Sequence, residues 1–478
     1  MTNQKLILIT GSTGYIGRNL IPRLLDRGYR VRCLARDATQ LRGQTWFSQV
    51  EIVECDINDC EILAAAMKDV SAAYYLIHNM SQGRNYPVLD LSSAANFTAA
   101  ASSNHVEQII YLGGLADPSS QIGMHMRSRL QTGEILRQGN VPVTEFRASV
   151  IIGPGSISFE MIRYLTEQFP ILFGPRWLHK LSQPIATQNV LDYLLAALET
   201  PACRGKILEI GGPEVMTYAN AMLEYARLRG LKRRLIIFPI VPVKLMAYWV
   251  DKLTPIPERI AAPLIDSMRS DSVVMNFEAR KVFPNIRLQK YQAAVSDALS
   301  QLSPRQIEPI WDNGFNPVII LKHAGFFIDF RQIQVQVSSQ VVYQSFTQLG
   351  GKWGWQYLDW LWKLRGLCDR FLGGPGMRGR RDEIEEGEVV DFYRVEKLEQ
   401  GRMMRLQAEL KAPGSGWMEW QVKPHLDSGS ILSQTAYFAP KGTLGFLYWY
   451  LLSFIHRKVF AGLLRNIARR ASKIKPIL

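Results

Sequence analysis

The stretch Lys5-Leu-Ile-Leu-Ile-Thr-Gly-Ser-Thr-Gly-Tyr-Ile-Gly17 decides the fold of the first part of the chain. Its opening apolar residues predict a short buried strand, and its three glycines predict a tight turn. The residues that follow, 18–27, have the apolar spacing of a helix. A strand, a glycine turn and a helix in this order are the setting in which a Gly-x-x-Gly-x-x-Gly string carries structural meaning.

Each glycine of the turn has a predicted role. Gly11 permits the tight turn, Gly14 lets the backbone approach a pyrophosphate, and Gly17 lets the helix pack close to the strand. Phosphates would lie at the helix N-terminus, where free N–H groups and the helix dipole favour negative charge. The alternative is a glycine turn in an α/β protein that binds no nucleotide. The predicted cofactor-binding turn consists of Gly11, Ser12, Thr13, Gly14, Tyr15, Ile16 and Gly17.

The first 150 residues alternate strand-like and helix-like segments. The further predicted strands are 30–35, 50–54, 72–77, 108–113 and 143–147, with helices such as 59–68 and 90–103 between them. This alternation predicts an α/β domain with a parallel, doubly wound sheet that binds its ligand at the carboxyl ends of the strands. Residues 151–302 have a looser pattern, with a proline-broken, lid-like segment, and predict a small lobe of the same domain.

The kind of nucleotide is indicated by the residue that ends the second predicted strand. An acidic residue about twenty positions past the glycines suits a ribose hydroxyl, whereas an arginine suits a 2′-phosphate. Arg36 stands there, and its guanidinium can grip a phosphate through two hydrogen bonds, unless it is merely a solvated surface residue. NADP(H) is therefore favoured, and the adjacent Asp37 leaves NAD as an alternative. Asp56 and Ile57 are placed to reach the adenine, although Asp56 could instead cap the next helix.

The composition is that of a globular protein of more than one domain. The 478 residues exceed what one hydrophobic core usually organises, and the hydrophobic and charged fractions are 47% and 21%. The five cysteines have no zinc or redox spacing, so no metal site is predicted. The formal net charge of +14 favours an anionic partner: a nucleotide, a nucleic acid or a membrane surface.

The second part of the chain has a different pattern. We place a linker at residues 303–325, because this region begins with a polar, proline-containing stretch. Residues 331–337 alternate with period two, which is typical of a half-buried strand. Further strand-like runs at 389–395, 403–410, 417–422 and 431–438 are separated by glycines and predict an antiparallel meander, followed by a long helix from Leu444 to about Ser472. The second domain is therefore placed at residues 326–478.

The first 300 residues resemble the NmrA-like, atypical or extended-type short-chain dehydrogenases/reductases. The resemblance lies in three runs, Thr10–Gly17, Arg147–Ser156 and Gln183–Val190. It implies an NAD(P)-binding Rossmann fold and, for many members, oxidoreductase activity.

The chain departs from that family where the chemistry takes place. Active members carry Ser or Thr after the fifth strand and then Tyr-x-x-x-Lys, in which the lysine lowers the pKa of the tyrosine for proton transfer. Here the strand ends in Gly113-Gly114, and the next helix has His125 and Arg129 in the expected places. His125 could donate a proton near neutral pH, and Arg129 could hold the nicotinamide ribose or a phosphate. The alternative is that His125 is an ordinary helix residue. Ser128 and Tyr111 are further candidates.

The C-terminal part resembles the SRPBCC (START-like) helix-grip domains, and more narrowly an uncharacterised domain fused behind NmrA-like proteins. The runs that carry the resemblance are 349–355, 364–366, 369–376 and 438–442. It implies an α+β fold that grips a long helix and often encloses an apolar ligand. Such a cavity could be lined by six tryptophans that core packing would explain as well: Trp353, Trp355, Trp360, Trp362, Trp417 and Trp420.

The last helix combines an apolar first half with a basic second half. Residues 444–455 are apolar on all sides but too few to span a bilayer, and Arg465, Arg469, Arg470 and Lys473 follow. A buried core helix and a peripheral membrane anchor are both compatible with this pattern. The short opening apolar run leads directly into the glycine turn and does not look like a signal peptide. We expect a cytoplasmic protein that can associate with the inner face of a membrane.

Two functions from different classes follow. The first is an NAD(P)H-dependent oxidoreductase that acts on an apolar substrate with a non-standard proton donor. The second is a catalytically inactive NADP(H)-binding redox sensor, or an assembly or structural factor at a membrane. Nucleic-acid binding is not expected, because the basic residues are not embedded in a reading motif.

Overall fold

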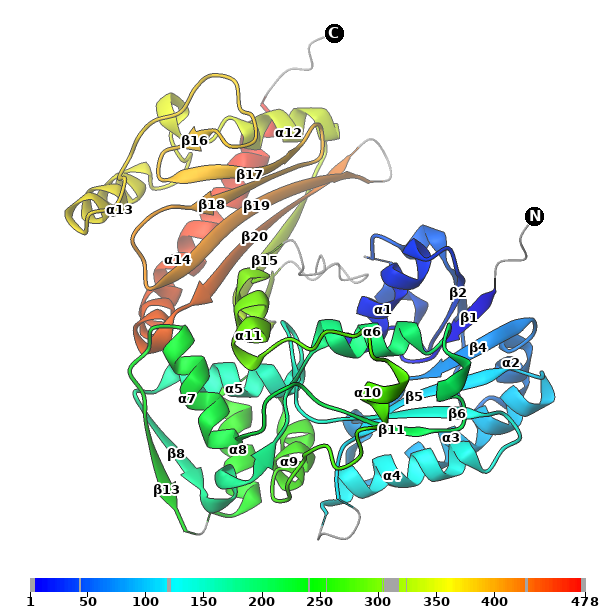
Figure 1. Cartoon of the computed structure of the whole chain (residues 1–478). Helices are drawn as coiled ribbons and strands as arrows, with labels where there is room; N and C mark the ends of the chain where they lie inside the picture. Colours follow the sequence, from blue (N-terminus) through cyan, green and yellow to red (C-terminus); the bar gives the residue numbers. More distant parts are fainter. Residues whose placement is uncertain are drawn as a thin grey trace. The chain divides into compact units, whose positions relative to one another are not determined.

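The structure is a computed structural model that divides into two compact units, Met1–Gln301 and Leu302–Leu478 (Figure 1). It describes residues 5–42, 44–117, 122–239, 241–254, 256–302, 304, 318–323, 325–425 and 429–473. Each unit is treated by itself below.

The first unit is built on a seven-stranded sheet. Its strands are β1 (Leu6–Ile9), β2 (Arg30–Ala35), β3 (Glu51–Glu54), β4 (Val70–Tyr75), β5 (Gln108–Gly114), β6 (Val143–Ala148) and β11 (Ile207–Ile210). Their order is β11-β6-β5-β4-β1-β2-β3, and every neighbouring pair is parallel. The strand order reverses between β1 and β4, which is the switch point where such sheets bind ligands. The predicted doubly wound parallel sheet is confirmed.

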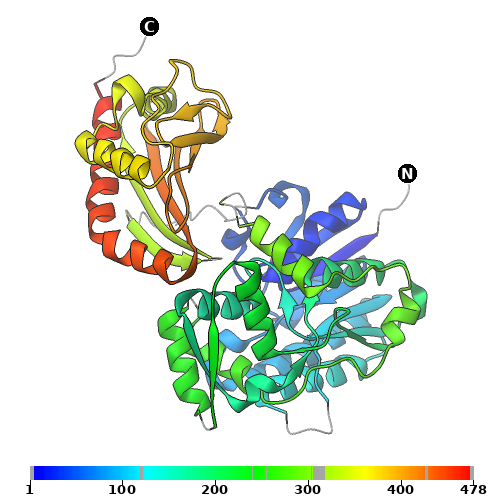
Figure 2. The same ribbon diagram turned by 60° about the vertical axis from the view of Figure 1, so that its left-hand side comes forward.

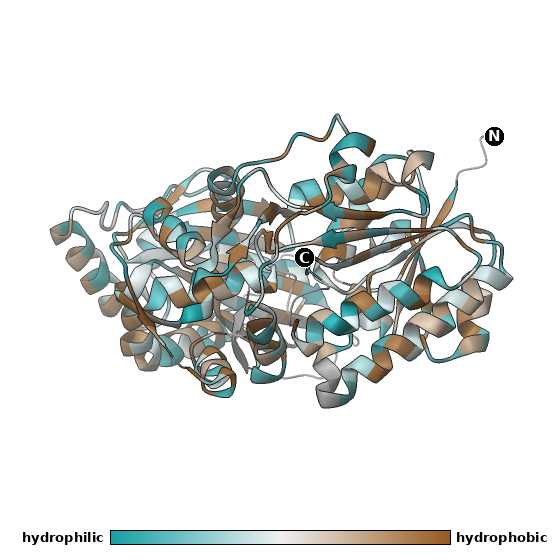
Figure 3. Ribbon diagram, turned by 60° about the horizontal axis from the view of Figure 1, so that its bottom comes forward, coloured by the Kyte–Doolittle hydropathy of each residue, from teal (hydrophilic) through white to brown (hydrophobic). Residues whose placement is uncertain are grey.

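Helices cover both faces of this sheet. α1 (Tyr15–Asp26) and α6 (Thr187–Ala196) contact each other on one face; α2 (Cys60–Ala66), α3 (Tyr86–Ser103) and α4 (Met124–Arg137) pack together on the other. Successive side chains of a strand point to opposite faces, so Ile7 and Ile9 enter the core beneath α1, and Leu6 and Leu8 the core beneath α3. Hydrophobic and hydrophilic residues alternate along the helices, as expected for helices that cover a sheet (Figure 3).

A small lobe follows β6. Its main elements are α5 (Ile157–Gln168), β8 (Ile171–Pro175), α7 (Tyr218–Leu228), β13 (Arg234–Phe238), α8 (Val243–Leu253), α9 (Glu258–Ser267) and α11 (Tyr291–Ser300). Shorter elements of the unit are β7 (Ile151–Ile152), β9 (Leu181–Ser182), β10 (Ile185–Ala186), β12 (Met216–Thr217), α10 (Glu278–Val282) and the 3₁₀ helices η1 (Ala38–Leu41), η2 (Phe47–Gln49), η3 (Met80–Asn85), η4 (Arg176–His179) and η5 (Pro201–Cys203). The proline-broken segment predicted as lid-like forms α8 and α9.

The second unit is a seven-stranded antiparallel sheet with a long helix along it (Figure 2). Its strands are β14 (Val318–His323), β15 (Phe326–Val335), β16 (Val389–Val390), β17 (Tyr393–Glu399), β18 (Met403–Ala408), β19 (Gly414–Pro424) and β20 (Ser430–Pro440). Its helices are α12 (Ser339–Thr347), η7 (Gly351–Trp353), α13 (Asp359–Phe371) and α14 (Gly442–Ala471). The predicted meander and terminal helix are present, whereas β14 occupies part of the stretch 303–325 that was predicted as a linker.

The two halves of α14 have different surroundings. The second half buries Phe460, Leu463 and Ile467 in the core of the second unit, whereas Leu451 and Phe454 of the first half are exposed. Lys473 is described and exposed, whereas the chain beyond it lies outside the described residues. In the part of the chain that the structure describes, no helix is long and apolar enough to cross a membrane. Contact of α14 with a membrane surface stays a prediction.

Candidate active site

The glycine turn joins β1 to α1 at the carboxyl edge of the parallel sheet. Gly11 has φ +67°, and a Cβ there would lie 2.6 Å from the carbonyl oxygen of Leu76 at the end of β4. A Cβ on Gly17 would overlap the carbonyl oxygen of Gly11. The turn therefore needs glycine at both positions, one for its left-handed backbone and the other for close packing of α1.

A cavity of about 590 Å³ begins at this turn and follows the carboxyl edge of the sheet. It passes Arg36 and Asp56 on one side of the switch point and reaches His125 and Arg129 on the other. The shape fits an extended dinucleotide, with phosphates at the glycine turn and the N-terminus of α1. All the residues predicted to bind the cofactor line this cavity except Ser12, and so do His125 and Arg129.

Ser12 has a structural contact instead. Its buried hydroxyl donates a hydrogen bond of 2.8 Å to the carbonyl oxygen of Leu34, which ties the glycine turn to β2. Tyr15 lines the cavity, but its hydroxyl lies 2.9 Å from Oγ1 of Thr187. Burial raises the pKa of Tyr15 to about 12, so this phenol stays protonated at neutral pH.

The residues predicted to lie near the adenosine half of the cofactor have different contacts in the structure. Arg36 is exposed and lines the cavity. The carboxylate of Asp37 accepts hydrogen bonds from the backbone N–H and the hydroxyl of Thr39, which lower its pKa and cap η1. Oδ1 of Asp56 accepts hydrogen bonds of 2.9 Å from the backbone and side-chain N–H groups of Asn58. Asp59, not Asp56, caps α2.

His125 belongs to a buried cluster that the sequence did not reveal. Its Nδ1 lies 3.1 Å from Nε2 of His78, and Nδ1 of His78 lies 3.3 Å from Oδ2 of Asp90. The contact between His78 and Asp90 is close but lacks good hydrogen-bond alignment. Asp90 also accepts hydrogen bonds from the backbone N–H of Asn79 at 3.0 Å and from the hydroxyl of Ser128 at 2.9 Å. These contacts fix the carboxylate beside His78.

The electrostatics of the cluster set the protonation of His125. Burial holds the pKa of His125 well below its ordinary value, and the neighbouring His78 and Arg129 lower it further. Burial also lowers the pKa of His78, although Asp90 opposes this. Burial raises the pKa of Asp90, but the contacts with His78, the backbone N–H of Asn79 and the charge of Arg129 together outweigh it and lower the pKa overall. A charged Asp90 favours a proton on Nδ1 of His78, which leaves Nε2 of His78 as an acceptor. That acceptor favours a proton on Nδ1 of His125, so Nε2 of His125 is then a proton acceptor.

The burial of His125, which could not be read from the sequence, favours its neutral imidazole. Proton donation by His125 near neutral pH stays a prediction.

Arg129 holds the edge of the sheet together. Its guanidinium donates a hydrogen bond of 3.1 Å to the carbonyl oxygen of Ile77, just beyond β4. It also donates a hydrogen bond to the carbonyl oxygen of Leu112, within β5. It also lies 4.9 Å from the ring centre of Tyr111, whose hydroxyl donates to the carbonyl oxygen of Arg129 at 2.8 Å. Tyr111 and Ser128 are thus buried partners of other residues, and neither lines the cavity.

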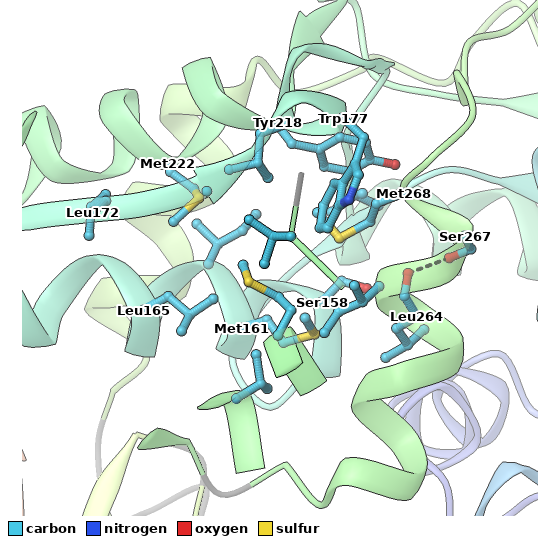
Figure 4. Close-up of a pocket in the computed structure, with 18 of the residues that line it drawn as sticks. Ser158, Met161, Leu165, Leu172, Trp177, Tyr218, Met222, Leu264, Ser267 and Met268 are labelled. Atoms are coloured by element: carbon cyan, nitrogen blue, oxygen red, sulfur yellow. Dashed lines mark hydrogen bonds between the residues drawn. The ribbon is translucent and has the colours of Figure 1, made fainter. Parts of the chain in front are cut away.

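A second cavity, of about 540 Å³, adjoins the first within the same unit. The two share five lining residues: Gly114, His125, Ser149, Ser158 and Leu264. The walls are almost entirely apolar, and Met161, Met222 and Met268 converge with Trp177 on this space (Figure 4). Methionine side chains are flexible and suit apolar ligands of varied shape.

No local pattern in the sequence indicates this cavity, because its walls come from α5, β8, α7, α8 and α9, which are widely separated along the chain. The apolar ligand was predicted to bind in the second unit instead. Of the six tryptophans proposed as a lining there, Trp355, Trp362, Trp417 and Trp420 are buried and Trp360 is exposed. Trp355 stacks on Trp362 with ring centres 4.5 Å apart, as in ordinary core packing. In the described part of the chain, no group of His, Cys, Asp or Glu residues could hold a metal ion.

Comparison with known proteins agrees with the glycine turn and the sheet order. Residues 11–138 match the model of a family described as NAD(P)H-binding. The first unit is an NAD(P)-binding Rossmann domain. Residues 323–463 match a family described only as a protein of unknown function. The likeness of the second unit to helix-grip domains therefore stays a prediction.

Several known proteins are similar to this chain. It is 26% identical over 215 residues to the mitochondrial NADH dehydrogenase (ubiquinone) 1 alpha subcomplex subunit 9 of Dictyostelium discoideum, and the match spans 44% of this chain and 60% of that protein. It is 25% identical over 233 residues to (4-alkanoyl-5-oxo-2,5-dihydrofuran-3-yl)methyl phosphate reductase of Streptomyces griseus subsp. griseus, spanning 47% of this chain and 74% of that one. A solved structure of the triphenylmethane reductase of Citrobacter sp. superposes with a TM-score of 0.50 at 19% identity, over 62% of this chain and 99% of the other. The last likeness concerns the fold.

Proposed function

We propose that the protein is an NADP(H)-dependent oxidoreductase whose substrate is apolar and binds in the methionine-rich cavity of the first unit. The observation that carries this proposal is the junction of the two cavities. His125 and Ser149 line both the crevice that fits the dinucleotide and the apolar cavity beside it. A substrate in the apolar cavity would therefore meet the nicotinamide end of the cofactor site beside a buried imidazole.

The residues of the chain supply the proton chemistry of this reaction. The bound cofactor supplies or accepts a hydride. In the oxidation of a hydroxyl group, Nε2 of neutral His125 accepts the hydroxyl proton as the hydride leaves the adjacent carbon. In the reduction of a carbonyl group, the His78–His125 pair first takes up a proton from solvent, and Nε2 of His125 then donates it to the carbonyl oxygen. His78 can relay the proton, and the charge of Asp90 stabilises the protonated pair. His125 thus replaces the family's tyrosine as the proton-transfer residue.

The preference for NADP(H) rests on the residues at the adenosine end. Arg36 lines the cavity there, whereas Asp37 caps η1 and is not part of the lining. A guanidinium at this place suits a 2′-phosphate, and the carboxylate that would suit a ribose hydroxyl is engaged elsewhere.

A non-catalytic function is the second candidate. The helix that follows β5 lacks the Tyr-x-x-x-Lys pair, and one relative is a subunit of an NADH dehydrogenase. A protein of this kind would bind NADPH as a structural or sensing ligand at a larger assembly.

The test is NADPH oxidation with a series of apolar quinones, enals and ketones of increasing chain length. We expect turnover with at least one class, and a loss of kcat of about a hundredfold or more in His125→Gln with NADPH binding unchanged. His179→Gln, which changes an exposed histidine outside both cavities, is the matched control. Tight NADPH binding without turnover of any acceptor would favour the non-catalytic function.

A further inference from the structure

The outer wall of the apolar cavity faces solvent with apolar side chains. Six apolar residues both line the cavity and are exposed, and we call them the rim: Phe169, Ile171, Phe173, Phe238, Leu245 and Trp249. Phe173 is 60% exposed and Trp249 is 52% exposed. Exposed apolar groups that continue into a cavity mark a surface that binds something apolar.

The local structure explains why these side chains are not buried. β8 and β13 form a two-stranded parallel pair of their own, in which Phe173 lies opposite Ile236. The rings of Phe173 and Phe238 have centres 5.8 Å apart, so the exposed face of this pair is a continuous apolar surface. α8 adds Leu245, Tyr248 and Trp249 while burying Ala247 and Val250, so it is apolar on both faces. An apolar exposed face of this kind calls for a partner other than water.

Basic residues accompany the rim. The segments 169–176, 232–239 and 241–253 contain six basic residues and one acidic residue, Asp251. Arg176, Lys232, Arg234 and Lys244 are exposed, and Lys252 lies 3.4 Å from Asp251. Exposed aromatic and aliphatic side chains among lysines and arginines are typical of surfaces that enter the headgroup region of anionic lipid bilayers.

We propose that the rim docks on the surface of an anionic lipid bilayer, so that a substrate dissolved in the bilayer enters the apolar cavity without crossing water. The entry of substrate rests on the function proposed above, whereas the docking does not. A bilayer explains three features together: the apolar face, the surrounding cations, and the continuity of the rim with a cavity that leads to His125.

Two exposed tryptophans allow the docking face to be located. Trp249 lies on the rim, and Trp360 lies on α13 of the second unit and is 62% exposed. The experiment mixes the full-length protein with vesicles of phosphatidylcholine and phosphatidylglycerol in which the acyl chains carry bromine, a short-range quencher of tryptophan fluorescence. We expect quenching that Trp249→Phe removes for the most part and Trp360→Phe leaves intact. Vesicles of phosphatidylcholine alone should give much weaker quenching.

A pair of charge substitutions provides the second measurement. Phe173→Glu should reduce flotation with the anionic vesicles by about tenfold or more, because it removes the inserted ring and adds a repelled charge. Met275→Glu, at a residue 76% exposed outside the rim and the cavity, should leave flotation unchanged.

Several results would overturn the proposal. Quenching lost in Trp360→Phe but kept in Trp249→Phe would assign membrane contact to the second unit. A dimer in solution that Phe173→Glu dissociates would assign the rim to a second copy of the chain, and absence of quenching would exclude docking. Docking without turnover of any apolar acceptor would refute the proposed oxidoreductase activity and leave the docking surface standing.

Discussion

Replacing Arg36 by alanine should weaken the binding of NADPH and leave the binding of NADH nearly unchanged. Arg36 directly follows β2, and the last residue of that strand, Ala35, is buried and pairs with Glu54 of β3. Arg36 thus projects into the adenosine end of the cavity from a fixed backbone. Only NADPH carries a 2′-phosphate on the adenosine ribose, so only its affinity should depend on this charge.

The expected size of the effect follows from the exposure of the site. A hydrogen bond to a charged group contributes about 1.5–3 kcal/mol when it is protected from water. Arg36 is exposed, so solvent screening reduces this to about 1–2 kcal/mol. The dissociation constant of NADPH should therefore rise about five- to thirtyfold in Arg36→Ala.

Titration calorimetry with NADPH and with NADH measures both affinities. Arg42→Ala is the matched control, because Arg42 is an exposed arginine of the same region that does not line the cavity. Asp37→Asn should preserve the preference for NADPH, because Asp37 caps η1 instead of facing the cavity. Equal losses for the two cofactors in Arg36→Ala, or an equal effect of Arg42→Ala, would refute the reasoning.

Three further predictions concern the glycine turn and the buried histidines. Gly17→Ala should lower the free energy of unfolding by about 1–3 kcal/mol in urea titrations, because its Cβ overlaps the backbone of Gly11. In Gly14→Ala the Cβ would lie 3.1 Å from the carbonyl oxygen of Gly11, so this variant should lose NADPH affinity with a smaller loss of stability. Asp90→Asn should lower the pKa of His78 further in an NMR titration, since the carboxylate raises that pKa; an unchanged pKa would contradict the effect of this contact. Burial lowers the pKa of His456, in the second unit, from 6.5 to about 4. Between these two pKa values the histidine of the unfolded state is protonated and that of the folded state is not. The second unit should therefore lose about 2 kcal/mol of stability when the pH is lowered from 8 to 5. In His456→Phe, urea titration at the two pH values should show this difference removed, and a difference that persists would place the proton uptake elsewhere.

The sequence by itself determined the framework of both units. The strand, glycine turn and helix at the start of the chain are local features, because each glycine restricts the backbone of its own neighbourhood and each strand shows a short apolar run. The order of strands and helices in the first 150 residues then follows from the rules for parallel sheets. Arg36 was found from its spacing to the glycines, whereas His125 was found from the resemblance to the short-chain dehydrogenases/reductases, at the place of their tyrosine.

The chemistry of the site was decided only by the tertiary structure. His78 lies in the loop after β4, Asp90 on α3 and His125 on α4, and no local pattern indicates that the three side chains meet in a largely buried cluster. Burial lowers the pKa of His125 and so favours its neutral form, which the ordinary pKa of histidine does not indicate. Ser12 belongs to the glycine string by sequence, but packing against β2 turns its hydroxyl away from the cavity.

The apolar cavity is the clearest example of a feature that local sequence patterns do not indicate. Its walls come from five elements of the small lobe, and each of their methionines, leucines and aromatic residues has the same local pattern as a core residue. A side chain that lines a cavity and one that fills a core differ only in what lies opposite, and that depends on how distant elements pack. The sequence therefore determined that this chain carries a dinucleotide turn, and the tertiary structure decided what lies beside it.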